Sequence, residues 1–260
     1  MSEIIGAERD ALLLRILKNI AEAKPHADAE AWERGWTQAL ENFRDLPLVS
    51  SLLPAFIKDY EPTRHRGGFH RGVSEMVYVC SIHDWLAEQI LDCDNVYEFG
   101  CGTGFNLVAL AKRAPEKCYV GLDRSYASAQ LVLEAAEALE LPILSGQFDM
   151  LEPRADMPHN VGAFTFGSME QLGDFKPFIE WLLKQKPRIV VHIEPIPELL
   201  DPDNLVDWLS LEFHRKRGYT VGLLPYLQAH PQIEVMHVER SHFGSLFLES
   251  YARIVWRPRG

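Results

Sequence analysis

The feature that constrains this chain most is a short apolar run that ends in a glycine-rich turn. Residues 96–99 are apolar apart from one acidic side chain, and Gly100, Gly102 and Gly104 follow at alternate positions. Residues 109–111, beyond the turn, are typical of a helix. Because glycine carries no Cβ atom and tolerates positive φ, the backbone of such a turn can pass close to a flat ligand. The arrangement predicts a nucleotide-type cofactor that lies on the end of a parallel sheet.

The spacing of the glycines distinguishes between cofactors. A dinucleotide fingerprint needs glycine or alanine at the sixth place of G-x-G-x-x-G, but counted from Gly100 that place is the bulky Phe105. Glu98, two residues before the first glycine, has no role in the dinucleotide pattern. Taken alone, the turn is also compatible with a tight strand-to-helix connection that binds no ligand.

The same stretch resembles motif I of the class I S-adenosylmethionine-dependent methyltransferases, (D/E)-x-G-x-G-x-G. The resemblance, which extends over about residues 73–256, implies that the glycine turn borders the methionine and ribose portions of the cofactor. It also implies that the acidic residue anchors the loop and the amino-acid end of the cofactor. The cofactor-binding residues expected from this motif are Glu98, Gly100, Cys101, Gly102, Thr103 and Gly104.

Two further strand-like runs end in carboxylates. Residues 118–123 end in Asp123, whose carboxylate can accept hydrogen bonds from both ribose hydroxyls. Residues 143–150 end in Asp149 and Met150, and the resemblance implies that these two meet the adenine amino group and the adenine ring. Each aspartate alone is more often a helix cap or a turn residue. Together, carboxylates at the ends of three successive strands predict S-adenosylmethionine as the cofactor.

Composition and charge narrow the class of protein and its partners. The chain has 260 residues, is 47% hydrophobic and 24% charged as folded globular proteins are, and carries a formal net charge of −11. This acidity argues against a nucleic-acid partner. We also expect no membrane partner, because no apolar run is long enough to span a bilayer, and no basic signal sequence begins at residue 2. The four cysteines form no C-x-x-C pair, which is typical of reduced thiols in a cytoplasmic protein.

The N-terminal third is helical in pattern. We expect a helical cap over residues 1–72, followed by a methyltransferase domain over residues 73–260. The expected helices cover residues 10–23, a segment that Asp28 caps, residues 47–60 and residues 73–91. In many class I methyltransferases such a cap lies over the open edge of the sheet and supplies most of the substrate pocket.

Two features of this cap have more than one interpretation. An aromatic stripe on the second expected helix, which we interpret as core packing rather than a ligand box, consists of Trp32, Trp36, Leu40 and Phe43. The cationic segment 64–72 has two interpretations that the sequence leaves open. Arg71 or its neighbours could bind the cofactor carboxylate or an anionic substrate group, or the segment could be a solvated loop paired with surface acids.

The chemistry is expected in the C-terminal half. Residues 161–166 predict a fourth strand and residues 188–193 a fifth, and strand ends on this edge of the sheet face the ligand crevice. We therefore expect Glu170, His192 and Glu194 to converge on the transferred methyl group as catalytic residues. His192 and Glu194 share one face if the strand persists that far, and a histidine beside a carboxylate can act as a general base. The alternative is a structural histidine near the end of the sheet.

The last part of the chain completes the expected fold. Residues 233–238 and 246–256 are expected to form an antiparallel strand pair, and the tail from Pro258 is expected to be disordered. The predicted fold class is therefore α/β. It consists of a doubly wound, mostly parallel seven-stranded sheet with an antiparallel last strand, preceded by an N-terminal helical cap.

The expected function is methyl transfer from S-adenosylmethionine to a small polar metabolite or sugar. Oxygen is the expected acceptor atom, because a hydroxyl gains from a base whereas an amine needs only to be deprotonated and placed. No metal is expected, since the paired aspartates of catechol-type enzymes are not found around the fourth strand. The alternatives are transfer to a protein or another nitrogen acceptor, and a methyltransferase-like protein that binds the cofactor without methyl transfer. The sequence does not indicate the oligomeric state.

Overall fold

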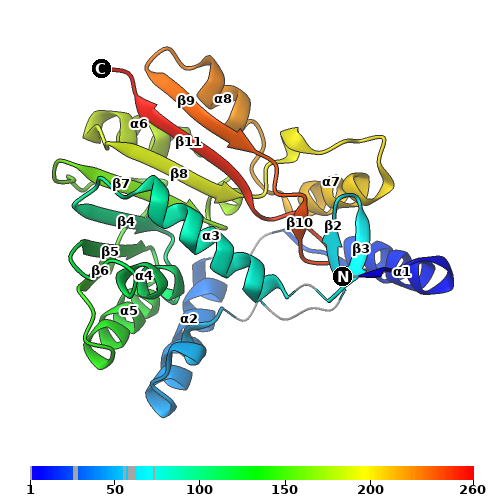
Figure 1. The fold of residues 1–260 in the computed structure, drawn as a ribbon, viewed down its shortest axis with the longest axis horizontal. Helices are drawn as coiled ribbons and strands as arrows, with labels where there is room; N and C mark the ends of the chain where they lie inside the picture. Colours follow the sequence, from blue (N-terminus) through cyan, green and yellow to red (C-terminus); the bar gives the residue numbers. More distant parts are fainter. Residues whose placement is uncertain (1, 26–28, 55–56, 58–61, 73) are drawn as a thin grey trace.

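The computed structural model describes residues 2–25, 29–54, 57, 62–72 and 74–260. Its centre is a seven-stranded sheet with the strand order β6-β5-β4-β7-β8-β11-β9 (Figure 1). The seven strands are β4 (Asn95–Phe99), β5 (Cys118–Asp123), β6 (Ile143–Gln147), β7 (Val161–Phe166), β8 (Ile189–Glu194), β9 (Ile233–Glu239) and β11 (Ala252–Pro258). The predicted α/β fold class, with its doubly wound and mostly parallel seven-stranded sheet, is confirmed.

The first five strands of this sheet are parallel, and β11 lies antiparallel between β8 and β9. The expected disorder from Pro258 is wrong, because β11 runs to that residue and the backbone N–H of Arg259 donates to the carbonyl of Gln232 at 2.7 Å. The last strand also begins at Ala252, six residues later than residue 246 where it was expected. Residues 243–244, which precede the expected strand, belong to a second, smaller sheet.

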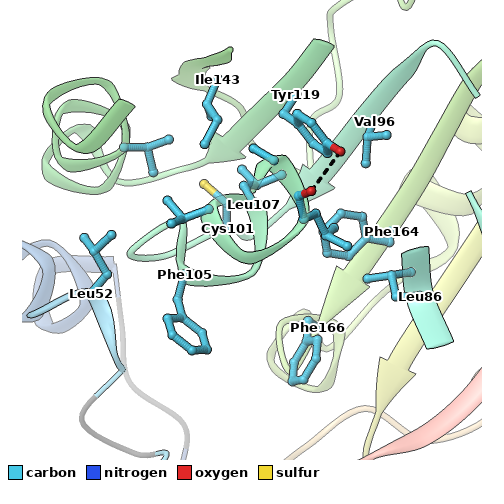
Figure 2. Close-up of a cluster of buried hydrophobic side chains, with 14 of the residues drawn as sticks. Leu52, Leu86, Val96, Cys101, Phe105, Leu107, Tyr119, Ile143, Phe164 and Phe166 are labelled. Atoms are coloured by element: carbon cyan, nitrogen blue, oxygen red, sulfur yellow. Dashed lines mark hydrogen bonds between the residues drawn. The ribbon is translucent and has the colours of Figure 1, made fainter. Parts of the chain in front are cut away.

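Helices cover both faces of the large sheet (Figure 1). The helices that pack on one face are α3 (Glu75–Gln89), α4 (Phe105–Ala111) and α5 (Tyr126–Ala138), and those on the other are α6 (Lys176–Gln185) and α8 (Leu223–Ala229). Because both faces are covered, every residue of β7 is buried, and the strand is a continuous run without alternation. Figure 2 shows part of the core on the first face, where Leu86, Leu107 and Phe164 come together. Within the described ranges, no helix is long and apolar enough to cross a membrane.

The small sheet is antiparallel, with the order β1-β3-β2-β10. Its strands are β1 (Ser2–Glu3), β2 (Thr63–His65), β3 (Gly68–Arg71) and β10 (Phe243–Gly244). The small sheet therefore combines segments from both sides of the predicted boundary between residues 72 and 73. That boundary stays a prediction, since residue 73 lies outside the described residues.

The cationic segment is a β-hairpin of this small sheet, not the loop that the sequence suggested. Arg66 and Gly67 form its two-residue turn, with φ values of 48° and 76°, which suits a tight hairpin. Arg64 is buried and donates to the carbonyl of Val206, while Arg71 forms an ion pair with Glu8. In this structure the two arginines thus have partners within the protein.

Two helices precede the hairpin, α1 (Gly6–Glu22) and α2 (Ala29–Asp45). The first packs on α7 (Leu205–Arg217), and the second packs on α5. The aromatic stripe of α2 enters the core only in part, because Leu40 and Phe43 are buried whereas Trp32 and Trp36 are half-buried and stack on each other. The third expected helix is reduced to the short 3-10 turn η1 (Val49–Leu52), and residues 55–56 and 58–60 of that expectation lie outside the described residues.

Candidate functional site

The glycine turn between β4 and α4 has a backbone that only glycine accommodates. Gly100, Gly102 and Gly104 have φ values of 73°, 53° and 73°. A Cβ atom on Gly100 would lie 2.4 Å from the Cβ of Ser168, and one on Gly104 would lie 2.8 Å from a methyl carbon of Val132. Positive φ and close packing therefore act together, and the turn holds the carboxyl end of β4 against the neighbouring elements.

Glu98 lies beneath this turn, fully inside the protein. Asn106 donates its amide to one Glu98 oxygen at 2.7 Å, and the Asn106 oxygen is 2.8 Å from Nε2 of His83. Burial raises the pKa of Glu98 to about 8. Through Asn106 and His83 the carboxyl group therefore links β4 to α4 and α3. Sequence reasoning missed Asn106 and His83, although Asn106 is the one polar side chain in the apolar helix α4.

Asp123 connects the glycine turn to the end of β5. One of its oxygens accepts the backbone N–H of Gly102 at 3.0 Å, and the other accepts that of Ser125 at 2.9 Å. Burial raises the pKa of Asp123, and these two backbone N–H groups act in the opposite direction. Each carboxylate oxygen has two acceptor positions, so both can still accept a ligand hydroxyl.

The side chains of Cys101 and Thr103 both contact other parts of the protein. The Cys101 sulfur lies 3.9 Å from the Ser128 hydroxyl, and burial raises the pKa of the Cys101 thiol. The Thr103 hydroxyl donates to the carbonyl of Leu52 at 2.5 Å and so ties η1 to the turn.

Asp149 and Met150 lie beside the same edge of the sheet. The backbone N–H of Phe148 donates to the carbonyl of Asp123 at 2.8 Å, which brings this segment to the end of β5. The Met150 methyl carbon would be 3.4 Å from a Cβ on Gly100. Asp149 accepts the backbone N–H of Leu151 at 2.9 Å as a turn residue, and its side chain is only partly buried. The segment that carries the third predicted carboxylate therefore lies beside the end of β5, and Met150 approaches the glycine turn.

Glu170 and Glu194 form a buried acid pair at the ends of β7 and β8. Glu170 lies in the short turn η2 (Met169–Gln171), and Glu194 is 1% exposed. Burial raises the pKa of the Glu194 carboxyl group well above its usual range, and the neighbouring charge of Glu170 acts in the same direction. Two carboxyl groups this close disfavour a second negative charge, so Glu194 holds its proton more tightly than an exposed glutamate does.

The acid pair is joined to the glycine turn through Ser168. The backbone N–H of Ser168 donates to Glu194 at 3.2 Å, and its hydroxyl donates to the carbonyl of Phe99 at 2.9 Å. On the other side, the backbone N–H of Thr220 donates to the Glu170 carbonyl at 2.7 Å. Sequence reasoning missed Ser168 and Thr220, because serine and threonine in loops carry no distinctive signal. Among the described side chains, no group of three or more His, Cys, Asp or Glu residues could hold a metal ion.

His192 lies on the same face of β8 as Glu194 but is enclosed in the core. Its Nε2 accepts the indole N–H of Trp256 at 2.9 Å, so Nδ1 carries the proton and donates to the Thr165 hydroxyl at 2.9 Å. Burial lowers the pKa of His192 to about 3. Contrary to the sequence-based expectation of a general base, both ring nitrogens are already used, and this geometry favours a structural role.

Comparisons with known proteins bear on the fold. No protein-family model matches the chain, and no curated protein sequence matches it. Among solved structures, the [4+2]-cyclase SpnF is similar with a TM-score of 0.62 and 16% identity, covering 92% of this chain and 98% of SpnF. The 16S rRNA methyltransferase RmtF, solved with S-adenosylhomocysteine, has a TM-score of 0.50 and 15% identity, over 95% of this chain and 82% of RmtF.

A third similar structure is the O-methyltransferase TomG from Streptomyces achromogenes, with a TM-score of 0.49 and 12% identity over 98% of this chain and all of TomG. The seven-stranded sheet with its antiparallel β11, the glycine turn after β4 and the similarity to SpnF and RmtF agree with one another. The chain has the fold of the class I S-adenosylmethionine-dependent methyltransferases.

Proposed function

We propose that this protein binds S-adenosylmethionine and transfers its methyl group to an oxygen of a small polar molecule such as a metabolite or sugar. The observation that carries the proposal is the buried pair of Glu170 and Glu194 beside the glycine turn. Because the same fold serves a [4+2]-cyclase as well as methyltransferases, the proposal rests on the residues of the site rather than on the fold.

The residues at the carboxyl edge fit the proposed cofactor. Asp123 retains acceptor capacity for the two ribose hydroxyls, and we assign the adenine to Asp149 and Met150, whose segment follows the end of β6 beside Asp123. The glycine turn lets neighbouring groups approach its backbone closely, since a Cβ atom on Gly100 or Gly102 would meet Ser168 or Trp36, and we assign the methionine portion of the cofactor to this turn. When bound, the cofactor supplies an electrophilic methyl group on a positively charged sulfur.

The acid pair suits the proton chemistry of a hydroxyl acceptor. A hydroxyl oxygen is a weak nucleophile until its proton leaves, and a carboxylate beside the acceptor can take up that proton. When it is ionised, Glu194 is a stronger base than an exposed glutamate, because its pKa is raised. The proton that it takes up from the acceptor hydroxyl then passes to water. Glu170 and Glu194 are therefore the catalytic residues of the proposal, with His192 fixed behind them.

The acceptor and the compartment are inferred from charge and cysteine usage. A formal net charge of −11 disfavours an RNA substrate such as that of RmtF, because a phosphate backbone would be repelled. The four cysteines are unpaired in the structure, which supports a reducing, cytoplasmic location. Two alternatives to this proposal must be tested. One is methyl transfer to a protein or another nitrogen acceptor, and the other is cofactor binding without methyl transfer.

Calorimetry with S-adenosylmethionine and S-adenosylhomocysteine tests cofactor binding directly. We expect binding by the wild-type protein, and affinity lower by about tenfold or more in Asp123→Ala, because two ribose hydrogen bonds to a charged group are lost. No binding at tens of micromolar would contradict the proposal. A metabolite screen for a mass gain of one methyl group then identifies the acceptor, and the stability of the product to mild acid and base distinguishes an ether from an ester.

A further inference from the structure

We propose that α2 is a clamp on the bound cofactor, in which Trp36 contacts the cofactor and Glu33 is the residue that positions Trp36. This inference rests on the proposed function, because it concerns the S-adenosylmethionine site. It adds an element from the N-terminal region to that site, and neither residue belongs to the glycine motif or to the strand ends.

Trp36 lies directly on the middle glycine of the turn. Two atoms of its six-membered ring, Cη2 and Cζ2, are 2.9 and 3.0 Å from the position of a Cβ on Gly102. The backbone N–H of Gly102 is the group that donates to Asp123. The indole therefore lies beside the point where the glycine turn meets the Asp123 carboxylate. A ligand bound at that point would contact the ring.

Glu33 fastens the same helix to the first turn of α5. Its two carboxylate oxygens accept the backbone N–H groups of Tyr126 and Ala127, each at 3.0 Å. These N–H groups are otherwise unpaired at a helix N-terminus, where the helix dipole also favours a negative charge. Tyr126 and Ala127 follow Asp123 closely in the chain, so Glu33 binds beside the ribose end of the site.

Glu33 and Trp36 act as a unit because of helical spacing. Residues three apart on an α-helix lie on the same side, so the contact of Glu33 with α5 sets the position at which Trp36 meets Gly102. Trp32 stacks on Trp36 with ring centroids 5.5 Å apart but is not among the atoms nearest to Gly102. The stacked pair limits the rotamers open to Trp36.

The two halves of α2 are held in different ways. The buried residues of the helix, Leu40 and Phe43, are both in its C-terminal half. The N-terminal half is held by the polar contacts of Glu33 and by the half-buried rings of Trp32 and Trp36. A helix anchored at one end by the core and at the other by two hydrogen bonds can adjust at the second end without unfolding. That end is the one that faces the cofactor site.

The test compares matched variants of the full-length protein on the same helix. Trp36→Phe removes the ring atoms that reach Gly102, whereas Trp32→Phe keeps an aromatic ring at the neighbouring position. Glu33→Gln and Glu33→Ala weaken or remove the contact with α5. The control is Glu30→Gln, because Glu30 has an 88% exposed side chain and forms only a surface ion pair with Arg34.

The readouts are the dissociation constant of S-adenosylhomocysteine, KM and kcat with the identified acceptor, and hydrogen exchange of the Tyr126 and Ala127 amides. We expect Glu33→Ala and Trp36→Phe to weaken S-adenosylhomocysteine binding by about tenfold or more, with Glu33→Gln intermediate. KM for S-adenosylmethionine should rise while kcat at saturation stays close to wild type. Both amides should exchange faster in Glu33→Ala. Trp32→Phe and Glu30→Gln should bind as the wild type does.

Two outcomes overturn the inference, and they are distinguishable. If the wild type binds S-adenosylhomocysteine and Glu33→Ala and Trp36→Phe bind it equally tightly, α2 is not a clamp, although the proposed function stands. If the wild type itself does not bind, the proposed function fails and the clamp with it. Should Glu33→Ala fail to fold by circular dichroism, Trp36→Phe and Glu33→Gln decide the question by the same measurements.

Discussion

Two buried glutamates at the same edge of the sheet have opposite surroundings. Glu98 is the last but one residue of β4, on the face covered by α3 and α4, and Glu194 ends β8 on the opposite face. Burial raises the pKa of both carboxyl groups. Glu98, however, meets the neutral amide of Asn106, whereas Glu194 meets a second carboxyl group, that of Glu170. An amide can hold a carboxyl group in place but cannot take up its proton. A second carboxyl group can exchange a proton with the first.

The difference shows that a strand-end carboxylate does not have a fixed role. Its neighbours on the next element decide whether it fastens the fold or carries chemistry. Substitutions at the two glutamates and at their neighbours separate these two roles.

Glu194→Gln should lower kcat by about 100- to 10,000-fold, because the amide cannot accept the proton of the acceptor hydroxyl. The affinity for S-adenosylhomocysteine should stay near the wild-type value, since Gln can still accept the backbone N–H of Ser168. The matched change on the other face, Glu98→Gln, should leave kcat much closer to wild type. Steady-state kinetics of both variants check this, and equal loss of kcat would remove the distinction between the two glutamates.

His192→Ala should lower the free energy of unfolding by roughly 3–5 kcal/mol, because it leaves a cavity and deprives the Trp256 indole and the Thr165 hydroxyl of their partner. Urea unfolding measures this change. The kcat of the folded fraction should be unaffected. A fall in kcat to the level of Glu194→Gln, in protein that is still stably folded, would return His192 to the catalytic residues.

The pH dependence of stability should differ between the wild type and Glu98→Gln. The folded protein holds a proton on Glu98 up to about pH 8, whereas an exposed glutamate releases it near 4.5. Its contribution to stability is therefore present below the lower value and is lost as the pH rises through the higher one. In Glu98→Gln the fall in unfolding free energy between about pH 5 and pH 8 should be smaller by a few kcal/mol. Urea titrations at both pH values measure it, and identical slopes would contradict the raised pKa.

Thr103→Val should have the smallest effect, a loss of about 1 kcal/mol of stability, because one hydrogen bond to the Leu52 carbonyl disappears from an otherwise unchanged shape. Thermal unfolding with and without S-adenosylhomocysteine checks it. A large loss of cofactor affinity would mean that the threonine hydroxyl faces the ligand rather than η1.

Some of this site was predictable because its signals are local. The strands were recognisable as apolar runs, since parallel strands covered on both faces show no alternation, and β7 is such a run. Asp123 and Asp149 stand directly after their strands, so the common edge of a parallel sheet brings them together. The small sheet that contains the hairpin of β2 and β3 was not predictable, because it also needs β10 from the far end of the chain. Pairing over such a distance leaves no mark on a short segment.

The α/β fold, the glycine turn and the carboxylates near it can be read from the amino-acid order alone, because hydrophobic runs and turn residues act within a few positions of one another. The roles of the individual side chains depend instead on how the folded chain packs. His192 is bonded to Trp256, 64 residues away, and Glu33 caps a helix that begins 93 residues later. Whether a buried histidine or glutamate is free for chemistry depends on which groups packing brings within hydrogen-bond distance, and that distance is set by the whole fold.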